Sequence, residues 1–195
     1  MPDFRNPWTT LSSRRFYESR YVDVDQDEVR HHSGMVHPYT ALRFRIYGIA
    51  VLPIFADGST YLIGQYRYLA QRYTWELPRG SGPKSVDPLE TAQRELKEET
   101  GAVAGQWLEV LRLMVSPGIT DEQAPCFVAW DLEQGTADPD PQEDLTLRRL
   151  PFHEAVAAAL NGTISDAASV ATLLAVQARA AQGALPADLL RRLVS

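Results

Sequence analysis

Three glutamates stand at the spacing of an α-helix, and they are the best candidates for chemistry in this sequence. Glu95, Glu98 and Glu99 are three and four positions apart, which places their carboxylates on one face of a helix. Like charges at these spacings repel one another. Hard cations such as Mg²⁺ bind to a few carboxylates and leave other positions for water or phosphate. The run therefore predicts a divalent-metal site for a phosphorylated ligand, with a solvated acidic face as the alternative.

The residues around these glutamates carry the start and stop signals of a helix. Asp87 and Pro88 form an N-cap followed by a proline at the first helical position, and Gly101 supplies the stop. At the helical period, a buried stripe is expected from four residues: Leu89, Ala92, Leu96 and Val103. The helix should thus present its acidic face beside the core, open to a cleft.

The segment 80–102 resembles the signature of the Nudix hydrolases, in which a loop glycine precedes a helical Arg-Glu-apolar-x-Glu-Glu-x-Gly pattern at a fixed distance. The matching residues are Gly80, Arg94, Glu95, Leu96, Glu98, Glu99 and Gly101. Two positions depart from the pattern: Val86 replaces the first glutamate, and Ala102 is a small version of the last apolar residue. In the family that glutamate usually supports the loop and the arginine. Val86 is therefore expected to leave Arg94 without its customary partner.

Other segments resemble the ADP-ribose and nucleoside-diphosphate-sugar branch of this family. They are residues 64–68, 75–78, 116–122 and 162–167, so the resemblance covers roughly residues 14 to 180. The chain departs from the branch at Arg79, where Pro-Ala-Gly is common. The substitution leaves the backbone carbonyl in place and adds a side chain that could contact phosphate.

The resemblance implies metal-assisted hydrolysis of the diphosphate bond of ADP-ribose or a nucleoside-diphosphate sugar, giving a nucleoside monophosphate and a sugar phosphate. The implied ligands of Mg²⁺ or Mn²⁺ are Glu95, Glu98, Glu99 and the backbone carbonyl of Arg79. The implied catalytic residues are Glu122 as the general base, Glu98 and Arg94. The implied substrate-binding residues are Arg67 and Arg79 for the phosphates and Glu76 for the nucleoside.

The sequence patterns predict strands first, then a strand–helix unit, then helices, which indicates an α/β protein with a mixed sheet and helices on both sides. The resemblance implies the Nudix α/β/α sandwich preceded by an N-terminal β-strand region. The predicted division is an N-terminal strand region, residues 1–45, and a catalytic domain with C-terminal helices, residues 46–195. Residues 46–55 and 61–68, separated by Asp57-Gly58, are expected to pair as a hairpin. By resemblance, the chain is expected to form a homodimer through residues 1–45, whose strands contribute to the partner's site.

Composition narrows the class of partner. The 195 residues carry a net charge of −6, and Lys84 and Lys97 are the only lysines, which disfavours a general nucleic-acid binder. No apolar run approaches the ~20 residues of a membrane-spanning helix. Cys126 is the single cysteine, so no internal disulfide is possible, and a cytoplasmic protein is expected.

Two other functions remain open at this stage. The replacement of the signature glutamate by Val86 motivates a non-catalytic Nudix-fold module that binds nucleotides. A Nudix hydrolase of capped or triphosphorylated RNA is the second alternative, disfavoured by the acidic balance of the chain. Phosphate release in the presence of Mg²⁺ separates the first alternative from an enzyme.

Overall fold

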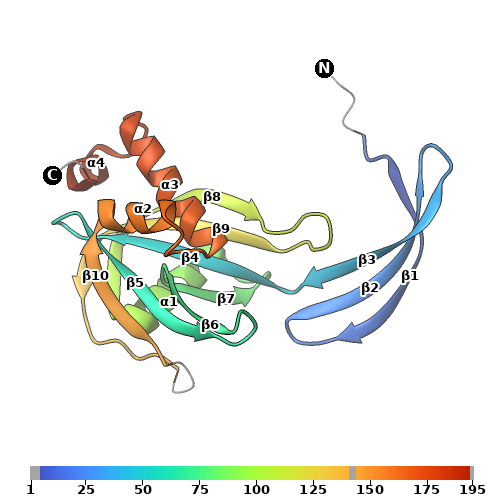
Figure 1. The fold of residues 1–195 in the computed structure, drawn as a ribbon, viewed down its shortest axis with the longest axis horizontal. Helices are drawn as coiled ribbons and strands as arrows, with labels where there is room; N and C mark the ends of the chain where they lie inside the picture. The colour runs from blue at the N-terminus through green and yellow to red at the C-terminus, as the bar shows by residue number, and fades with distance from the viewer. Residues whose placement is uncertain (1–4, 141–143, 194–195) are drawn as a thin grey trace. The chain divides into compact units, whose positions relative to one another are not determined.

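The computed structural model describes residues 5–140 and 144–193, which form two compact units. The first unit comprises residues up to 46 together with 114–122, and the second comprises residues 47–113 and those from 123 onward. The elements of each unit are labelled in Figure 1. Among the described residues, no helix is both long and apolar enough to span a bilayer.

The first unit is built on an antiparallel three-stranded sheet with β2 in the middle. Its strands are β1 (Trp8–Glu18), β2 (Val22–His31) and β3 (Val36–Phe44). Two irregularities interrupt the register between β1 and β2, and the pairing of β2 with β3 runs continuously from Val22–Phe44 to Arg30–Val36. Residues 114–122 join this unit through a bridge between Leu42 and Thr120.

Ion pairs between aspartates of β2 and nearby arginines lie on one face of this sheet. Asp23, Asp25 and Asp27 alternate along β2, so they share a face, and each is at most 5% exposed. Three arginines form ion pairs with them: Arg15 on β1, Arg43 on β3 and Arg45 directly after β3. The hydrogen bond from Arg15, together with that from Arg43, lowers the pKa of Asp25, although burial acts to raise it. Guanidinium groups therefore compensate the charge of these buried aspartates.

The second unit contains two sheets. The first has the order β7-β4-β9-β8 and the second β10-β5-β6. The strand bounds are β4 (Ile46–Ile54), β5 (Ser59–Arg67), β6 (Arg72–Glu76), β7 (Arg79–Pro83), β8 (Ala102–Met114), β9 (Gln123–Gln134) and β10 (Thr146–Pro151). The helices are α1 (Pro88–Thr100), α2 (Phe152–Leu160), α3 (Ala167–Ala181) and α4 (Ala187–Leu193). The sheets are mixed, since β4 pairs in parallel with β9 and β5 pairs antiparallel with β6 and β10.

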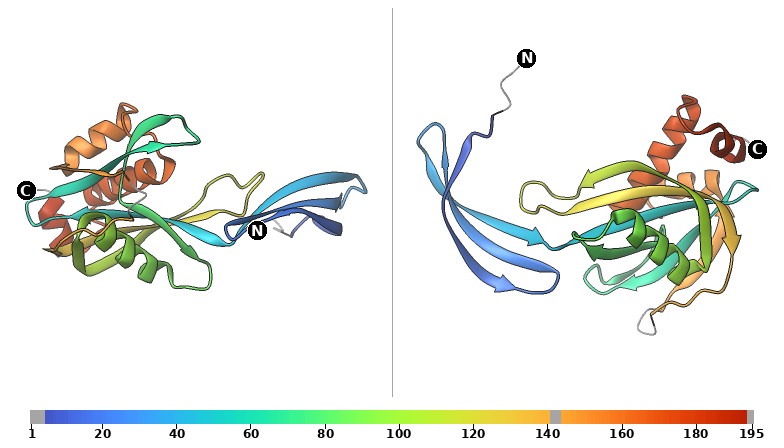
Figure 2. Two further views of the ribbon diagram at one scale, coloured as in Figure 1. Left: turned by 90° about the horizontal axis from the view of Figure 1, so that it is seen from below. Right: turned by 180° about the vertical axis from the view of Figure 1, so that it is seen from behind.

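Helices cover both faces of the sheet that contains β4 and β9. Successive residues of a strand point to opposite faces, so Leu52 and Val128 pack in a core with α2 and α3, whereas Val51 and Ala129 pack against α1. Figure 1 and Figure 2 show this layering, with α1 on one side of β4 and β9 and with α2 and α3 on the other. The expected α/β fold with a mixed sheet and an N-terminal strand region is confirmed.

Two local expectations are wrong. The segments on either side of Asp57-Gly58 form the turn but not a hairpin, because β4 and β5 belong to different sheets. Val103 is not part of the buried stripe of the helix and is 52% exposed. The helix ends at Thr100, since Gly101 adopts a left-handed φ of 73°, and Val103 already belongs to β8.

Candidate functional site

Helix α1 carries the three predicted metal-binding glutamates at different degrees of burial. Asp87 caps its first turn by accepting a hydrogen bond from the Leu89 amide at 2.9 Å. Glu99 is buried, Glu95 has a side chain that is 12% exposed, and the side chain of Glu98 is 43% exposed. One carboxylate thus remains accessible while two lie against the protein.

Strand β7 packs its backbone directly against these carboxylates. The Arg79 amide donates to Glu99 Oε2 at 3.0 Å, and the Ser81 amide donates to Glu95 Oε1 at 3.2 Å. A Cβ atom on residue 80 would overlap the Glu95 carboxylate, which would have to move from its present position. This close approach gives a physical reason for the fixed distance between Gly80 and Glu95 in the sequence.

Arg94 joins two of the three glutamates. Its Nη1 donates to Glu98 Oε2 at 2.6 Å, and its Nη2 donates to Glu95 Oε1 at 2.7 Å and to the Ser81 carbonyl at 3.1 Å. Arg94 thus has three other hydrogen-bond partners where Val86 replaces its customary one. Burial raises the pKa of Glu95, and the positive charge of Arg94 offsets this effect only in part.

A second polar cluster contains the three predicted substrate-binding residues. Arg67 on β5 and Glu76 on β6 form a forked ion pair, with Nε to Oε1 at 2.9 Å and Nη2 to Oε2 at 2.7 Å. Thr74 donates to the same carboxylate at 2.7 Å, and Nη1 of Arg79 lies 4.0 Å from it. Burial would raise the pKa of Glu76, but the hydrogen bonds from Arg67 and Thr74 lower it below its ordinary value.

Asp166 belongs to this cluster, and the sequence reasoning missed it. Its Oδ1 accepts a hydrogen bond from Nη1 of Arg79, and its Oδ2 accepts from the Ser169 amide at 2.8 Å as the N-cap of α3. The sequence contained one signal, an aspartate directly before an apolar helical segment. Its partner is 87 positions away, so the spacing of the residues could not identify it.

Glu122, the predicted general base, lies in the segment between β8 and β9. Its amide donates to Thr120 Oγ1 at 3.2 Å, and its carbonyl accepts from the Val115 amide at 3.3 Å. The preceding Asp121 is anchored by the Phe44 amide at 2.6 Å. These contacts lie within the first compact unit, so the role of Glu122 beside the α1 carboxylates stays a prediction.

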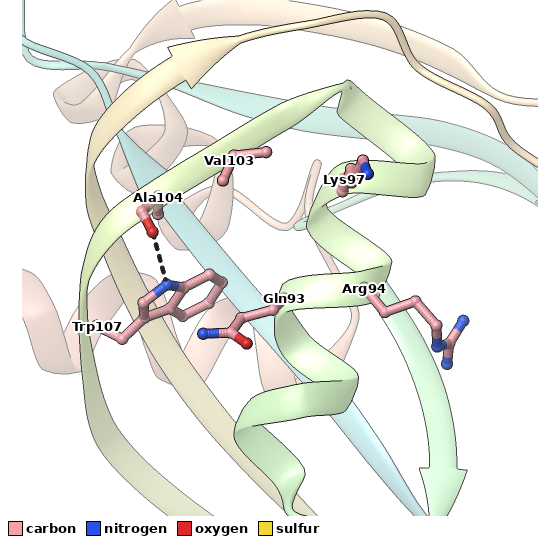
Figure 3. A pocket seen from close by; sticks show the side chains of 6 residues that line it. All are labelled: Gln93, Arg94, Lys97, Val103, Ala104 and Trp107. Carbon is pink, nitrogen blue, oxygen red and sulfur yellow. Dashed lines mark hydrogen bonds between the residues drawn. The ribbon is translucent and has the colours of Figure 1, made fainter.

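A cavity of about 520 Å³ lies between α1 and β8 (Figure 3). It is lined by Gln93, Arg94, Lys97, Val103, Ala104 and Trp107. In Figure 3, Trp107 donates to the Ala104 carbonyl, and the Arg94 guanidinium points away from the indole. The cavity contains none of the three glutamates, so it is not the predicted metal site.

Comparison with known protein families decides the class of the protein. The model of the NUDIX domain matches residues 45–173, which is well over half of the chain. The chain belongs to the Nudix family. Together with its curated relatives, this match makes the chain a Nudix hydrolase, as the signature in the sequence predicted.

The curated relatives of this Nudix hydrolase carry more than one name. The ADP-ribose pyrophosphatase of Mycobacterium tuberculosis (strain ATCC 25618 / H37Rv) is 30% identical over 87% of this chain and 83% of that protein. The methanol dehydrogenase activator of Bacillus methanolicus is also 30% identical, over 90% of this chain and 94% of that protein. A crystal structure of an ADP compounds hydrolase superposes with a TM-score of 0.81 at 23% identity, covering 92% of this chain and 98% of that one, which supports the fold.

Nudix hydrolases generally use divalent metal ions, and the donor chemistry of α1 fits such an ion. The carboxylates of Glu95, Glu98 and Glu99 would supply oxygen ligands, and burial raises the pKa of Glu95. Within the described parts of the chain, no three acidic, histidine or cysteine side chains converge on one point. Arg94 is the reason, because its guanidinium spans Glu95 and Glu98. Glu98, the most exposed of the three, is expected to exchange Arg94 for the cation.

Proposed function

We propose that this Nudix hydrolase cleaves the diphosphate bond of ADP-ribose or a nucleoside-diphosphate sugar in the presence of Mg²⁺ or Mn²⁺. Water adds across one bridging P–O bond, giving a nucleoside monophosphate and a sugar phosphate. The observation that carries the proposal is the glutamate face of α1, packed against Gly80 and bound by Arg94. The name of the relative from M. tuberculosis supports the choice of substrate class.

In this proposal, Glu95, Glu98, Glu99 and the carbonyl of Arg79 would hold the cation. When bound, a divalent cation supplies charge neutralisation at the diphosphate and acidifies water. The backbone of β7 keeps the carboxylates in place, since its amides donate to Glu95 and Glu99. Arg94 orients the accessible carboxylate of Glu98, which would also be a ligand of the cation.

The remaining residues of the proposed site act on substrate and water. Arg67 and Arg79 would donate hydrogen bonds to phosphate oxygens, and Glu76 orients Arg67 and would accept a hydrogen bond from the nucleoside. Glu122 would accept the proton of the attacking water as a general base, with Glu98 and Arg94 completing the catalytic group.

The test is a substrate panel with the purified chain and with Glu99→Gln as the matched control. The panel contains ADP-ribose, ADP-, GDP- and UDP-hexoses, dinucleoside polyphosphates and capped RNA, each with Mg²⁺, Mn²⁺ or chelator. We expect metal-dependent release of a nucleoside monophosphate from ADP-ribose or a nucleotide sugar, and no release by the variant. Cleavage restricted to capped RNA, or binding without cleavage, would contradict the proposal.

We further propose the division into residues 1–45 and 46–195 and a cytoplasmic homodimer formed through residues 1–45. Large exposed hydrophobic side chains support an association surface on this region: Trp8, Leu11, Phe16, Tyr17, Tyr21, Met35 and Val36. A single buried cysteine is consistent with a reducing compartment. Light scattering should give a dimer mass for the full chain and a monomer mass after Phe16→Glu. A monomer at all concentrations would contradict the dimer.

A further inference from the structure

Arg79 departs from the pattern of the family branch, and its side chain is held rather than free. The side chain is 19% exposed and donates through Nη1 to Asp166, while its backbone amide donates to Glu99 at 3.0 Å. The residue therefore links the first turn of α3 to the buried glutamate of α1. An alanine at this position could make only the backbone half of this link.

Asp166 makes this link while it also starts helix α3. One carboxylate oxygen accepts from the Ser169 amide at 2.8 Å and from the Ser169 hydroxyl at 2.7 Å, and the other accepts from Arg79. The Ser169 hydroxyl in turn accepts from the Leu77 amide at 2.9 Å, and both residues are fully buried. The segment from Leu77 to Arg79 is thus tied to α3 at two points, one polar and one ionic.

Charges in this region alternate. Arg67 binds Glu76, Glu76 lies 4.0 Å from Arg79, and Arg79 binds Asp166. Asp166 and Glu99 also act electrostatically on Arg67 and raise its pKa, after the larger effect of its bond to Glu76. A guanidinium held between two carboxylates loses rotational freedom before any ligand binds, so it is preorganised to receive a phosphate oxygen.

We propose that Asp166 is the positioning residue for Arg79: it fixes the guanidinium toward the diphosphate and fixes the Arg79 backbone toward Glu99 and the cation. This inference rests on the proposed function of the same site. It assigns a role to a residue at the start of α3, outside the signature segment, and to an arginine that the family branch commonly replaces with alanine.

The test uses Asp166→Asn, because asparagine is an equally good N-cap and still accepts from the Ser169 amide. The variant removes the charge facing Arg79 and leaves the start of α3 intact. We expect kcat/KM for the substrate found in the panel to fall about tenfold, mainly through KM, with little change in melting temperature. We also expect Mn²⁺ affinity, measured by calorimetry on the protein without substrate, to weaken by at least threefold.

Arg79 variants complete a double-mutant cycle. Arg79→Ala should lose as much kcat/KM as Asp166→Asn or more, Arg79→Lys should recover part of it, and Asp166→Asn added to Arg79→Ala should cost less than twofold. Asp87→Asn is the matched control, since Asp87 also caps a helix and accepts a hydrogen bond from the Leu89 amide. That control should change kcat/KM less than twofold.

Two results would overturn the inference: additive losses in the double variant, or a folded Asp166→Asn with wild-type KM and Mn²⁺ affinity. If Asp166→Asn does not fold, the Arg79 variants decide, because Arg79→Ala with wild-type KM and Mn²⁺ affinity also overturns it. If the wild-type chain cleaves no diphosphate, the proposed function fails by itself. The Mn²⁺ measurements then still support or reject the positioning role.

Discussion

Two triads of acidic residues in this protein share a pattern and differ in how their charge is compensated. Asp23, Asp25 and Asp27 follow the period of a strand, and three arginines bind them, from β1, from β3 and from the residue after β3. The glutamates of α1 follow the period of a helix. Arg94, on the same helix, forms ion pairs with Glu95 and Glu98.

The direction of the pKa shifts reports this difference. Hydrogen bonds from arginine lower the pKa of Asp25, whereas burial raises the pKa of Glu95 despite Arg94. Arg15 and Arg43 bind Asp25 within the sheet, whereas we propose that the glutamates of α1 bind a metal cation. Three acids on one face therefore do not identify a metal site by themselves, and the charges placed opposite them decide.

The largest expected effect comes from removing a glutamate of the α1 triad. Glu99→Gln should lower turnover by roughly 10³–10⁵-fold, since a bound cation contributes several kcal/mol at about 1.4 kcal/mol per tenfold. Steady-state kinetics at limiting Mg²⁺ measure it, with Asp25→Asn as the matched change in the strand triad. Asp25→Asn should keep kcat within about twofold at temperatures where it is folded. Wild-type activity in Glu99→Gln would contradict the proposal that Glu99 holds a metal ion needed for catalysis.

The next effect concerns Glu122, which belongs to neither triad. Glu122→Gln keeps size and hydrogen bonding but cannot accept a proton, so kcat should fall by about 10²–10⁴-fold with KM changed only a few-fold. Mn²⁺ affinity should stay at the wild-type value because the α1 carboxylates are unchanged. A variant that retains more than a third of wild-type kcat would place the base elsewhere, with Glu98 as the next candidate.

Neutralising one acid in each triad should move the stability of the metal-free protein in opposite directions. Asp25→Asn should lower the free energy of unfolding, because it removes the charge that Arg15 and Arg43 bind. Glu95→Gln should raise it by a few tenths of a kcal/mol, because the ionised form of Glu95 is disfavoured by burial. Urea denaturation in chelator at pH 7 measures both. A loss of stability in Glu95→Gln would show that the attraction of Arg94 for the Glu95 carboxylate outweighs the effect of burial.

Val86 offers a smaller effect. Val86→Glu restores the signature residue, and we expect activity between the wild-type value and about threefold above it, because Arg94 already has three hydrogen bonds. The side chain is half-buried, so an unpaired carboxylate would lower the melting temperature. Val86→Gln is the uncharged control. A much larger rise in activity would show that Arg94 lacks an essential partner in the wild-type chain.

The smallest effect is at Asp57, a single acid outside both triads. Hydrogen bonds from the Ser59 hydroxyl and amide, helped by Arg149, lower its pKa from 3.8 to about 2. A lowered pKa gives stability that is present above pH 4 and is lost as the pH falls toward 2. An NMR titration of the Asp57 carboxyl carbon should give a midpoint near 2, and Ser59→Ala should raise it. A midpoint near 3.8 in the wild-type protein would contradict the expected compensation.

The sequence by itself determined the helix, the family and the metal-binding candidates, because these depend on local signals. Asp87 and Gly101 set the ends of α1, and the period of the helix put the three glutamates on one face. The distance from Gly80 to Glu95 is also local, since a short connection returns β7 onto the helix. For residues close together in the sequence, the geometry of the helix or turn fixes which side chains lie near one another, so their contacts can be predicted from spacing.

Only the tertiary structure decided which charges face each other. Arg79 and its partner Asp166 are 87 positions apart in the sequence. Arg15 and Arg43, which bind Asp25 of β2, likewise come from two other strands. The hydrogen bond of Arg94 to the Ser81 carbonyl of β7 and the separation of β4 from β5 likewise depend on how the sheets form. A sequence pattern predicts on which face of a helix or strand a residue lies. The charged residues that pack against that face come from distant segments, so the sequence pattern alone does not show whether a charge is compensated.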